Sequence, residues 1–176
     1  MDESLNFGAG GAVSADRTTS HGRTAEGAVS AGRDPADDAD FAALTERIFG
    51  LAEKDWTQYS PLTLAWIGDT VFDMVIRTVL VKKANKQTEK LHREATALVN
   101  ARAQAQAAEK LLPSLTEEEA AIYRRGRNAD PHHNAKNAGR TQYLEATGFE
   151  TLIGWLYLEK RYTRILELVR EAYPDL

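Results

Sequence analysis

The spacing of apolar residues is the feature that most restricts the fold of this chain. From Phe41 to Leu176 they recur every three to four positions, as on one face of an α-helix. Apolar β-branched runs bounded by turn residues, which would indicate strands, are absent from this part of the sequence. The pattern predicts an all-α fold, a helical bundle. The most apolar stretch, Val71 to Val81, is interrupted by Asp73 and Arg77 and is shorter than the roughly 20 residues that cross a bilayer, so no membrane span is expected.

Capping residues and prolines predict where the helices begin and end. Asp40 and Ser60 suit the N-caps of the first two helices, and Pro61 suits the first helical position. Thr116, followed three residues later by Glu119, predicts a capping box. The breakers and polar residues from Gly126 to Thr141 predict a long loop. The expected helices cover Asp40–Lys54, Pro61–Val81, Thr88–Leu112, Thr116–Arg125, Gln142–Leu158 and Tyr162–Ala172.

Charge and composition divide the chain near residue 40. Residues 1–40 hold eight acidic and three basic side chains, a net charge of −5, whereas residues 41–176 have a net charge of +1. The first 40 residues are mostly small or polar, with Phe7 as their single aromatic, so they cannot bury enough apolar surface to fold. We therefore expect a disordered acidic tail before one domain over 41–176. The tail lacks the apolar centre of a secretory signal and is too acidic for a transit peptide, which favours a cytoplasmic location.

The sequence excludes several kinds of chemistry. It contains no cysteine, so it cannot form disulfides, cysteine-ligated metal centres or a thiol nucleophile. A phosphate-cradling glycine-rich loop with lysine and a Gly-x-Ser-x-Gly elbow are also absent. His92, His132 and His133 lack the spacing of metal ligands, so we assign them no chemistry.

Two carboxylates occupy unusual positions in otherwise apolar helices. Asp69 follows Gly68 and shares a helix face with apolar residues, and Glu150 lies four residues before Gly154 with no basic neighbour one turn away. An unpaired buried carboxylate costs several kcal/mol, so each acid needs a cation, a metal ion, a proton or the edge of a cleft. The apolar or small neighbours are Leu62, Ala65, Phe72 and Ile76 for Asp69, and Ala146, Thr147, Ile153 and Gly154 for Glu150.

Glycine beside each acid suggests how the two could meet. If the two helices cross closely at Gly68 and Gly154, Asp69 and Glu150 converge in one groove. Mg²⁺ binds through one or two protein carboxylates together with waters and substrate phosphates, which matches this pair. The alternative is that each acid pairs with an arginine from elsewhere in the fold, and the residue pattern alone leaves both possibilities open.

A basic segment forms the second group of interest. Residues 124–140 carry a net charge of +4 and several asparagines, and they contain no aromatic residue on which a base could stack. Guanidinium and amide groups bind phosphates and sugar hydroxyls, so this segment is expected to bind the backbone of a helical polyanion; a merely solvated loop is the alternative. The candidate RNA-binding residues are Arg124, Arg125, Arg127, Asn128, Lys136, Asn137 and Arg140.

Several segments, taken together and in order, resemble the Mini-ribonuclease III family. They extend over about Ser60 to Ala172, and the ordered set is far more specific than any member of it. The segments are Leu64-Ala65-Trp66-Ile67-Gly68-Asp69 with Phe72, Leu91-His92, Arg125-Gly126-Arg127-Asn128-Ala129, Lys136-Asn137 and Phe149-Glu150-Thr151-Leu152-Ile153-Gly154-Trp155.

The resemblance implies a homodimeric, Mg²⁺-dependent endonuclease that cuts both strands of duplex RNA, with maturation of 23S ribosomal RNA precursors as its task. Asp69 and Glu150 match the catalytic, metal-binding acids of the family, and Asp73 is a candidate outer ligand or a solvent-facing residue. Trp66 and Phe72 are candidates for the dimer interface. No further RNA-binding domain is expected, so RNA recognition rests on the catalytic domain.

The chain departs from full-length ribonucleases III at three positions, where Leu62, Ala65 and Thr147 replace acids. Mini-ribonucleases III share much of this reduction, which leaves the number of metal ions per site open. It also keeps a rival interpretation: a non-catalytic domain of this fold that binds structured RNA or a ribosome. A helical protein-interaction scaffold is a third possibility, and it predicts no salt-sensitive RNA affinity.

Overall fold

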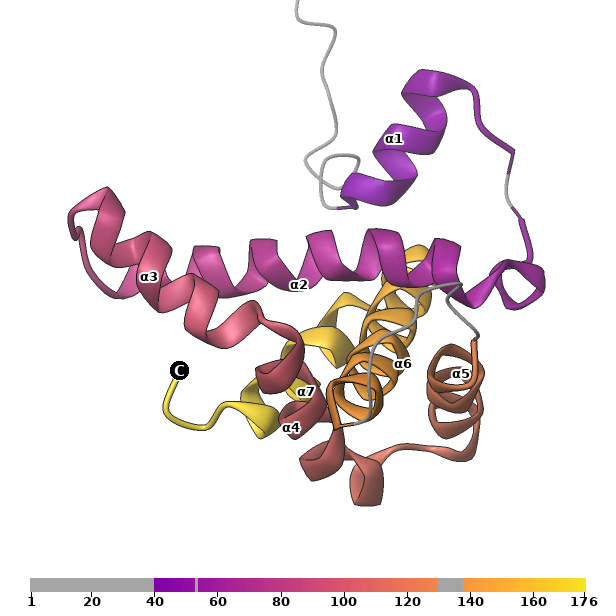
Figure 1. Cartoon of the computed structure of the whole chain (residues 1–176). Coiled ribbons are helices and arrows are strands. Elements are labelled where there is room, and N and C mark those ends of the chain that lie inside the picture. Colours follow the sequence, from indigo (N-terminus) through magenta and orange to yellow (C-terminus); the bar gives the residue numbers. More distant parts are fainter. Residues whose placement is uncertain (1–39, 53, 130–137) are drawn as a thin grey trace, which may run out of the picture. The chain divides into compact units, whose positions relative to one another are not determined.

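The computed structural model describes residues 40–52, 54–129 and 138–176, and these residues form helices without any strand (Figure 1). This confirms the predicted all-α fold. The bounds are α1 (Phe41–Phe49), η2 (Trp56–Gln58), α2 (Pro61–Lys83), α3 (Thr88–Val99), α4 (Ala101–Leu111), η3 (Leu112–Ser114), α5 (Glu117–Arg127), α6 (Ala138–Leu158) and α7 (Tyr162–Ala172), where η denotes a 3-10 helix. None of the described helices is long and apolar enough to cross a membrane. Residues 1–39, for which we predict an acidic tail, lie outside the described part of the chain.

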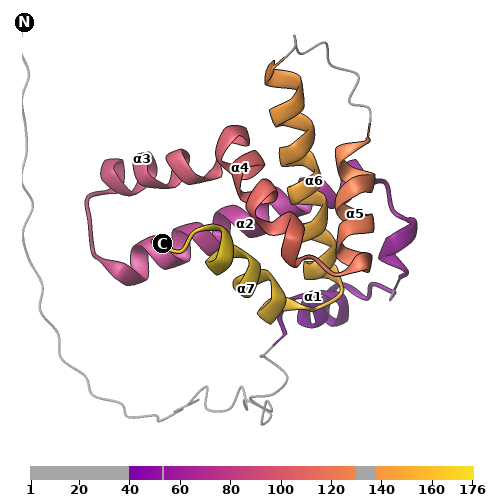
Figure 2. The ribbon, with the colours of Figure 1, turned by 90° about the horizontal axis from the view of Figure 1, so that it is seen from below.

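Helix α6 is the centre of the bundle. It packs against α2, α4, α5 and α7, which surround it in the view from below (Figure 2). Because α6 is apolar around most of its circumference, it is stable only when several neighbours cover it. The largest fully buried side chain is Trp155 of α6, and Phe149 of α6 meets Phe72 of α2 edge to face at 5.0 Å between ring centroids. Phe72 is fully buried in this single chain, so the prediction that it contributes to a dimer interface is wrong.

The backbones of α2 and α6 touch where the two helices cross. A Cβ atom added to Gly68 would collide with the carbonyl oxygen of Glu150 and lie 2.7 Å from the backbone nitrogen of Gly154. A Cβ added to Gly154 would in turn collide with the carbonyl oxygen of Leu64. Only glycine allows two helices to approach this closely. The close crossing considered for the two glycine-flanked helices is therefore present.

Several predicted helix boundaries need correction. The helix expected to end at Val81 extends to Lys83. The first helix ends at Phe49 rather than Lys54, because Gly50 adopts the left-handed conformation with φ 63° and closes the helix. The predicted helix Thr88–Leu112 is broken at Asn100, whose side chain caps α4 by accepting a hydrogen bond from Ala103 N at 3.0 Å. Both ends of the loop expected from Gly126 to Thr141 are helical, since α5 extends to Arg127 and α6 begins at Ala138; residues 130–137 lie outside the described part of the chain.

Other predicted boundaries and caps agree with the structure. The Thr116–Glu119 capping box is present, and α7 has the predicted bounds. Asp40 caps α1 by accepting a hydrogen bond from Ala43 N at 3.0 Å. Ser60 precedes α2 as predicted, but its side chain makes no capping hydrogen bond.

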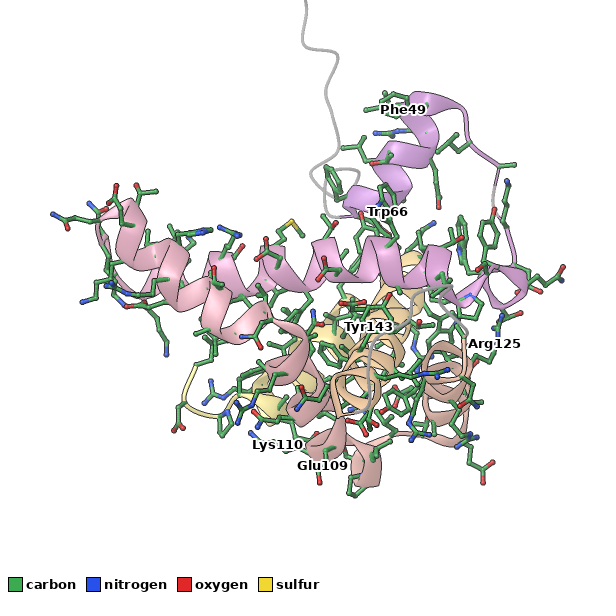
Figure 3. The ribbon with its side chains drawn as sticks, in the orientation of Figure 1. Phe49, Trp66, Glu109, Lys110, Arg125 and Tyr143 are labelled. Atoms are coloured by element: carbon green, nitrogen blue, oxygen red, sulfur yellow. The ribbon has the colours of Figure 1, made fainter. Side chains whose placement is uncertain are left out.

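Helix α1 is held to the end of α6 and the start of α7 by polar contacts. Tyr162 Oη donates to Asp40 Oδ1 at 2.5 Å, and Lys160 Nζ lies 2.9 Å from Glu46 Oε2. The large apolar residues of α1 point outward: Phe41 is 69% exposed and Phe49 is 73% exposed. On α2, Trp66 points away from α6 toward the side of the bundle on which α1 lies (Figure 3). This chain thus presents apolar side chains on α1 and on the outer side of α2.

Candidate active site

The crossing of α2 and α6 brings Asp69 and Glu150 together. Asp69 follows Gly68 on α2, and the Glu150 carbonyl is the atom that a side chain at position 68 would strike. The carboxylates are close enough for the negative charge of Asp69 to raise the pKa of Glu150. Two acids that are 81 positions apart in the sequence therefore belong to one site.

The two acids differ in their exposure to solvent. Asp69 is exposed although Ala65, Phe72 and Ile76 on the same helix face are buried, so it lies at the edge of the apolar stripe and not inside the core. Glu150 is only partly accessible, and burial together with the charge of Asp69 raises its pKa from 4.5 to about 7. Neither acid has an arginine or lysine partner among the contacts of the described residues, in contrast to the arginine-paired alternative.

Gln104 of α4 is a site residue that the sequence did not indicate. Its side chain is 1% exposed, and its Nε2 donates a hydrogen bond to Asp69 Oδ1 at 3.1 Å. A hydrogen bond from the same side chain to Glu150 opposes the rise in that residue's pKa. No sequence pattern links Gln104 to acids 35 and 46 positions away, so only the fold could reveal this contact.

Asp73 lies one turn beyond Asp69 on α2. Its Oδ2 accepts a hydrogen bond from Arg77 Nε at 2.6 Å, whereas its Oδ1 is buried without a hydrogen-bond partner. The side chain is 32% exposed, so it is neither a free surface group nor a core residue. A buried oxygen without a donor is available to a water molecule or a bound group.

The acids of the site suit Mg²⁺ better than a metal that needs a full protein cage. The described residues contain no group of three histidine, cysteine, aspartate or glutamate side chains that could hold a metal ion. Asp69 and Glu150 supply two hard oxygen donors whose mutual repulsion a divalent cation would relieve. Mg²⁺ commonly takes one or two carboxylates and completes its octahedron with waters and substrate oxygens.

Most of the basic residues near the end of α5 and the start of α6 are exposed, and one of them is hydrogen-bonded within the protein. Arg124, Arg127 and Arg140 are exposed, as is Asn128, which ends α5. Arg125 is partly buried and its Nη2 donates to the carbonyl oxygen of Tyr59 at 2.9 Å, so it also ties α5 to the segment before α2 (Figure 3). The predicted RNA-binding residues Lys136 and Asn137 lie outside the described part of the chain.

A second basic cluster lies at the corner between α2 and α3. Residues 77–93 carry a net charge of +5, which exceeds the net charge of the predicted basic segment over the same length. Most of its cations are exposed, although Lys86 pairs with Glu94 at 2.6 Å. The same count of charges along the sequence could have found this cluster. Its members are Arg77, Lys82, Lys83, Lys86, Lys90 and Arg93.

Comparison with known proteins agrees with this architecture. Residues 62–161 match the Ribonuclease III domain. Proteins named Mini-ribonuclease 3 are similar over most of the described chain: that of Enterococcus faecalis is 44% identical over 118 residues, which cover 66% of this chain and 89% of its own length. The chain belongs to the Mini-ribonuclease III family.

Further relatives agree with the family membership. The Mini-ribonuclease 3 of Clostridium tetani is 41% identical over 128 residues, covering 70% of this chain and 84% of its own length. A crystal structure of a Fusobacterium nucleatum protein superposes with a TM-score of 0.60 at 30% sequence identity, covering 66% of this chain and 93% of the other. Family membership makes this chain an endoribonuclease of the ribonuclease III type. Helix α1 precedes residue 62, where the match to the family domain begins.

Proposed function

We propose that this endoribonuclease cuts both strands of duplex RNA with Mg²⁺ held by Asp69 and Glu150. The observation that carries the proposal is the crossing at Gly68 and Gly154, which brings together two carboxylates that form no ion pair with the described residues. A structural ion pair would place an arginine or lysine there. Two acids that repel one another are retained in a site when a cation binds between them.

In this proposal the chain's own residues orient the ion and the RNA. Asp69 is exposed and can meet an incoming phosphate, whereas Glu150 approaches from the protein interior. Bound Mg²⁺ would supply a hydroxide from water and stabilise negative charge on the scissile phosphate, leaving 5′-phosphate and 3′-hydroxyl ends. Asp73 Oδ1, buried and without a donor, is suited to accept a hydrogen bond from a nearby water.

The basic groups are proposed to bind the RNA backbone. Arg124, Arg127, Asn128 and Arg140 are exposed near the ends of α5 and α6, and guanidinium and amide groups bind phosphates and 2′-hydroxyls. Lys136 and Asn137 of the same segment are proposed to take part, as is Arg125 when it is not bound to Tyr59. The corner between α2 and α3 adds a second positive surface for the duplex.

We further propose a homodimer, because two strands require two sites and twofold symmetry supplies them. The apolar residues on the outer side of α2 support this assignment: Trp66 is 77% and Met74 54% exposed in the single chain. A helix that is apolar on both sides is normally covered on both. Sedimentation equilibrium should give twice the chain mass, and Trp66→Glu should shift the protein toward monomer.

The proposed natural substrate is a 23S ribosomal RNA precursor, and this substrate implies that the enzyme acts in the cytoplasm. Family resemblance supports this finer assignment. Incubating the protein with a precursor transcript and mapping the ends should show paired cuts on opposite strands of a terminal stem. Cuts confined to single-stranded regions would contradict it.

The test of the catalytic assignment is cleavage of a long perfect RNA duplex in Mg²⁺ by Asp69→Asn and Glu150→Gln. Each variant removes one charged oxygen donor while keeping the size of the side chain, so cleavage should fall by at least about 100-fold. Retained helicity by circular dichroism controls for folding. Wild-type-like cleavage by both variants would refute the assignment of these acids.

A non-catalytic RNA-binding domain is the rival that the non-acidic residues Leu62, Ala65 and Thr147 favour. Chelation separates the two functions. Adding EDTA should abolish cleavage by a metal-dependent enzyme, whereas the RNA complex of a pure binder should persist in a gel-shift experiment. An RNA complex without Mg²⁺-dependent fragments would support the rival, and absence of salt-sensitive binding would support a protein scaffold.

A further inference from the structure

Gln104 is a buried polar residue whose contacts point to a role in the acid site. It lies on α4 and is 1% exposed, while its amide reaches Asp69 on α2 at 3.1 Å and also hydrogen-bonds Glu150 on α6. A third helix therefore contacts both candidate ligands. A buried amide that merely filled space would leave its hydrogen-bonding groups without partners, which destabilises the folded protein.

We propose that Gln104 is a positioning residue, which holds Asp69 and Glu150 in the arrangement that Mg²⁺ requires through hydrogen bonds from its side-chain amide. This inference rests on the proposed function of the two acids. Gln104 is not itself assigned to bind the metal or to touch the RNA. Its contribution is to fix two side chains that would otherwise rotate apart.

The chemistry of an amide suits this task. Two adjacent carboxylates repel one another, so they need a hydrogen-bond donor between them before any cation arrives. A lysine or arginine would donate, but its positive charge would neutralise the site and compete with Mg²⁺. The side-chain amide of glutamine supplies two N–H donors and no charge. It can therefore orient both acids and leave their charge available to the ion.

Local structure fixes the position of Gln104 on α4. Asn100 caps this helix four residues earlier by accepting a hydrogen bond from Ala103 N at 3.0 Å. Small buried side chains, Ala105, Ala107 and Ala108, let α4 pack closely against its neighbours α6 and α7. The break at Asn100 thus ends α3 and begins a separate helix that directs Gln104 at the α2–α6 crossing.

The experiment compares Gln104→Leu with Gln106→Leu. Gln106 lies on the same helix but is exposed, so its replacement controls for the loss of a glutamine from α4. Mg²⁺ binding to the full chain without RNA is measured by isothermal titration calorimetry, and cleavage of duplex RNA is measured in parallel. Loss of a hydrogen bond that orients a metal ligand typically lowers metal affinity 10- to 100-fold. We expect that loss for Gln104→Leu and a change within twofold for Gln106→Leu.

A second measurement uses the wild-type chain and needs no substitution. The side-chain amide resonances of Gln104 should shift in a ¹⁵N–¹H spectrum when Mg²⁺ is added, because their acceptors become metal ligands. It remains informative if Gln104→Leu fails to fold. Resonances that stay in place at saturating Mg²⁺ would overturn the proposal, as would Mg²⁺ affinity within twofold of wild type in folded Gln104→Leu.

The two proposals fail in different ways. If the wild-type chain binds no Mg²⁺ or cuts no duplex RNA, the proposed function fails. If the wild-type chain binds Mg²⁺ and cuts duplex RNA while Gln104→Leu does both equally well, only the positioning role of Gln104 fails.

Discussion

Two buried glutamates in this bundle have opposite surroundings. Glu119 on α5 is fully buried and accepts hydrogen bonds from Arg164 Nε at 2.9 Å and Arg164 Nη2 at 3.0 Å. Glu150 on α6 is mostly buried and faces a second carboxylate, that of Asp69. Burial disfavours the charge of both. Hydrogen bonds from Arg164 and from the backbone of Thr116 nevertheless lower the pKa of Glu119, whereas burial together with the charge of Asp69 raises the pKa of Glu150 to about 7.

We propose that this difference separates a structural acid from one that binds a metal ion. Glu119 completes a capping box and joins α5 to α7, so its charge is satisfied within the protein. Glu150 has a neutral amide and a like charge as neighbours, so its charge is satisfied only when a cation is supplied from outside. In a helical domain that contains both, the presence or absence of an arginine partner distinguishes the two roles.

Removal of the charge of Glu119 should have the largest effect on stability. Glu119→Gln keeps an acceptor for the capping box but removes the closer carboxylate partner of the Arg164 guanidinium, which is 25% exposed and keeps the 3.5 Å contact with Glu167. Because this arginine keeps some contact with water, we expect a loss of about 3 kcal/mol in the free energy of unfolding. Urea denaturation would measure it.

Glu118→Gln is the matched control, since Glu118 is 61% exposed and bonds Arg161 at the surface. Glu118→Gln should change the free energy of unfolding by no more than about 0.5 kcal/mol. Equal losses at positions 118 and 119 would remove the distinction between a surface pair and a buried one.

Separation of the two helices at their crossing should affect stability and catalysis together. Gly68→Ala places a methyl group against the Glu150 carbonyl, so α2 and α6 must move apart at an expected cost of about 2 kcal/mol. The rate of RNA cleavage by Gly68→Ala should also fall, because Asp69 and Glu150 move apart. Gly139→Ala in the same helix as Glu150 has no atom within 4 Å of the new methyl group and should change neither property appreciably. Full activity in a folded Gly68→Ala protein would argue that the close approach is not needed.

Removing the charge of Glu150 should raise the free energy of unfolding, whereas removing the charge of Glu119 should lower it. The folded state holds a proton on Glu150 up to about pH 7, whereas the unfolded chain releases it near 4.5, so unfolding becomes easier as pH rises through this window. Metal-free Glu150→Gln lacks this penalty. It should be more stable than wild type by about 2 kcal/mol at pH 8 and by almost nothing at pH 4, as thermal melts in EDTA would show. Greater stability of wild type than of Glu150→Gln at pH 8 in EDTA would contradict the unfavourable surroundings assigned to the Glu150 charge.

Local signals in the sequence predicted much of the fold. The capping residues Asp40 and Thr116 and the bounds of α7 follow from short-range patterns. The two glycines next to the acids also suggested the crossing of α2 and α6. The break at Asn100 was missed because apolar spacing continues through it, while its asparagine side chain competes for the backbone of the next turn.

Long-range contacts could not be predicted from the same patterns. Asp69 shares a helix face with the buried Phe72 and Ile76, as the spacing predicted, but the spacing could not show that its carboxylate reaches solvent. Gln104 and Arg125 gain their partners, Asp69 and Tyr59, only through the tertiary fold. The sequence suggested that the two acids could meet, whereas it gave no sign of their unequal exposure or of the hydrogen bond from Gln104 to Asp69.

The most direct test is a crystal structure of the protein soaked in Mn²⁺, which replaces Mg²⁺ at oxygen sites and scatters anomalously. An ion with carboxylate oxygens of both Asp69 and Glu150 in its coordination sphere is predicted, with the Gln104 amide hydrogen-bonded to those ligands. An occupied site elsewhere, or the two carboxylates turned away from one another with no ion between them, would contradict the account.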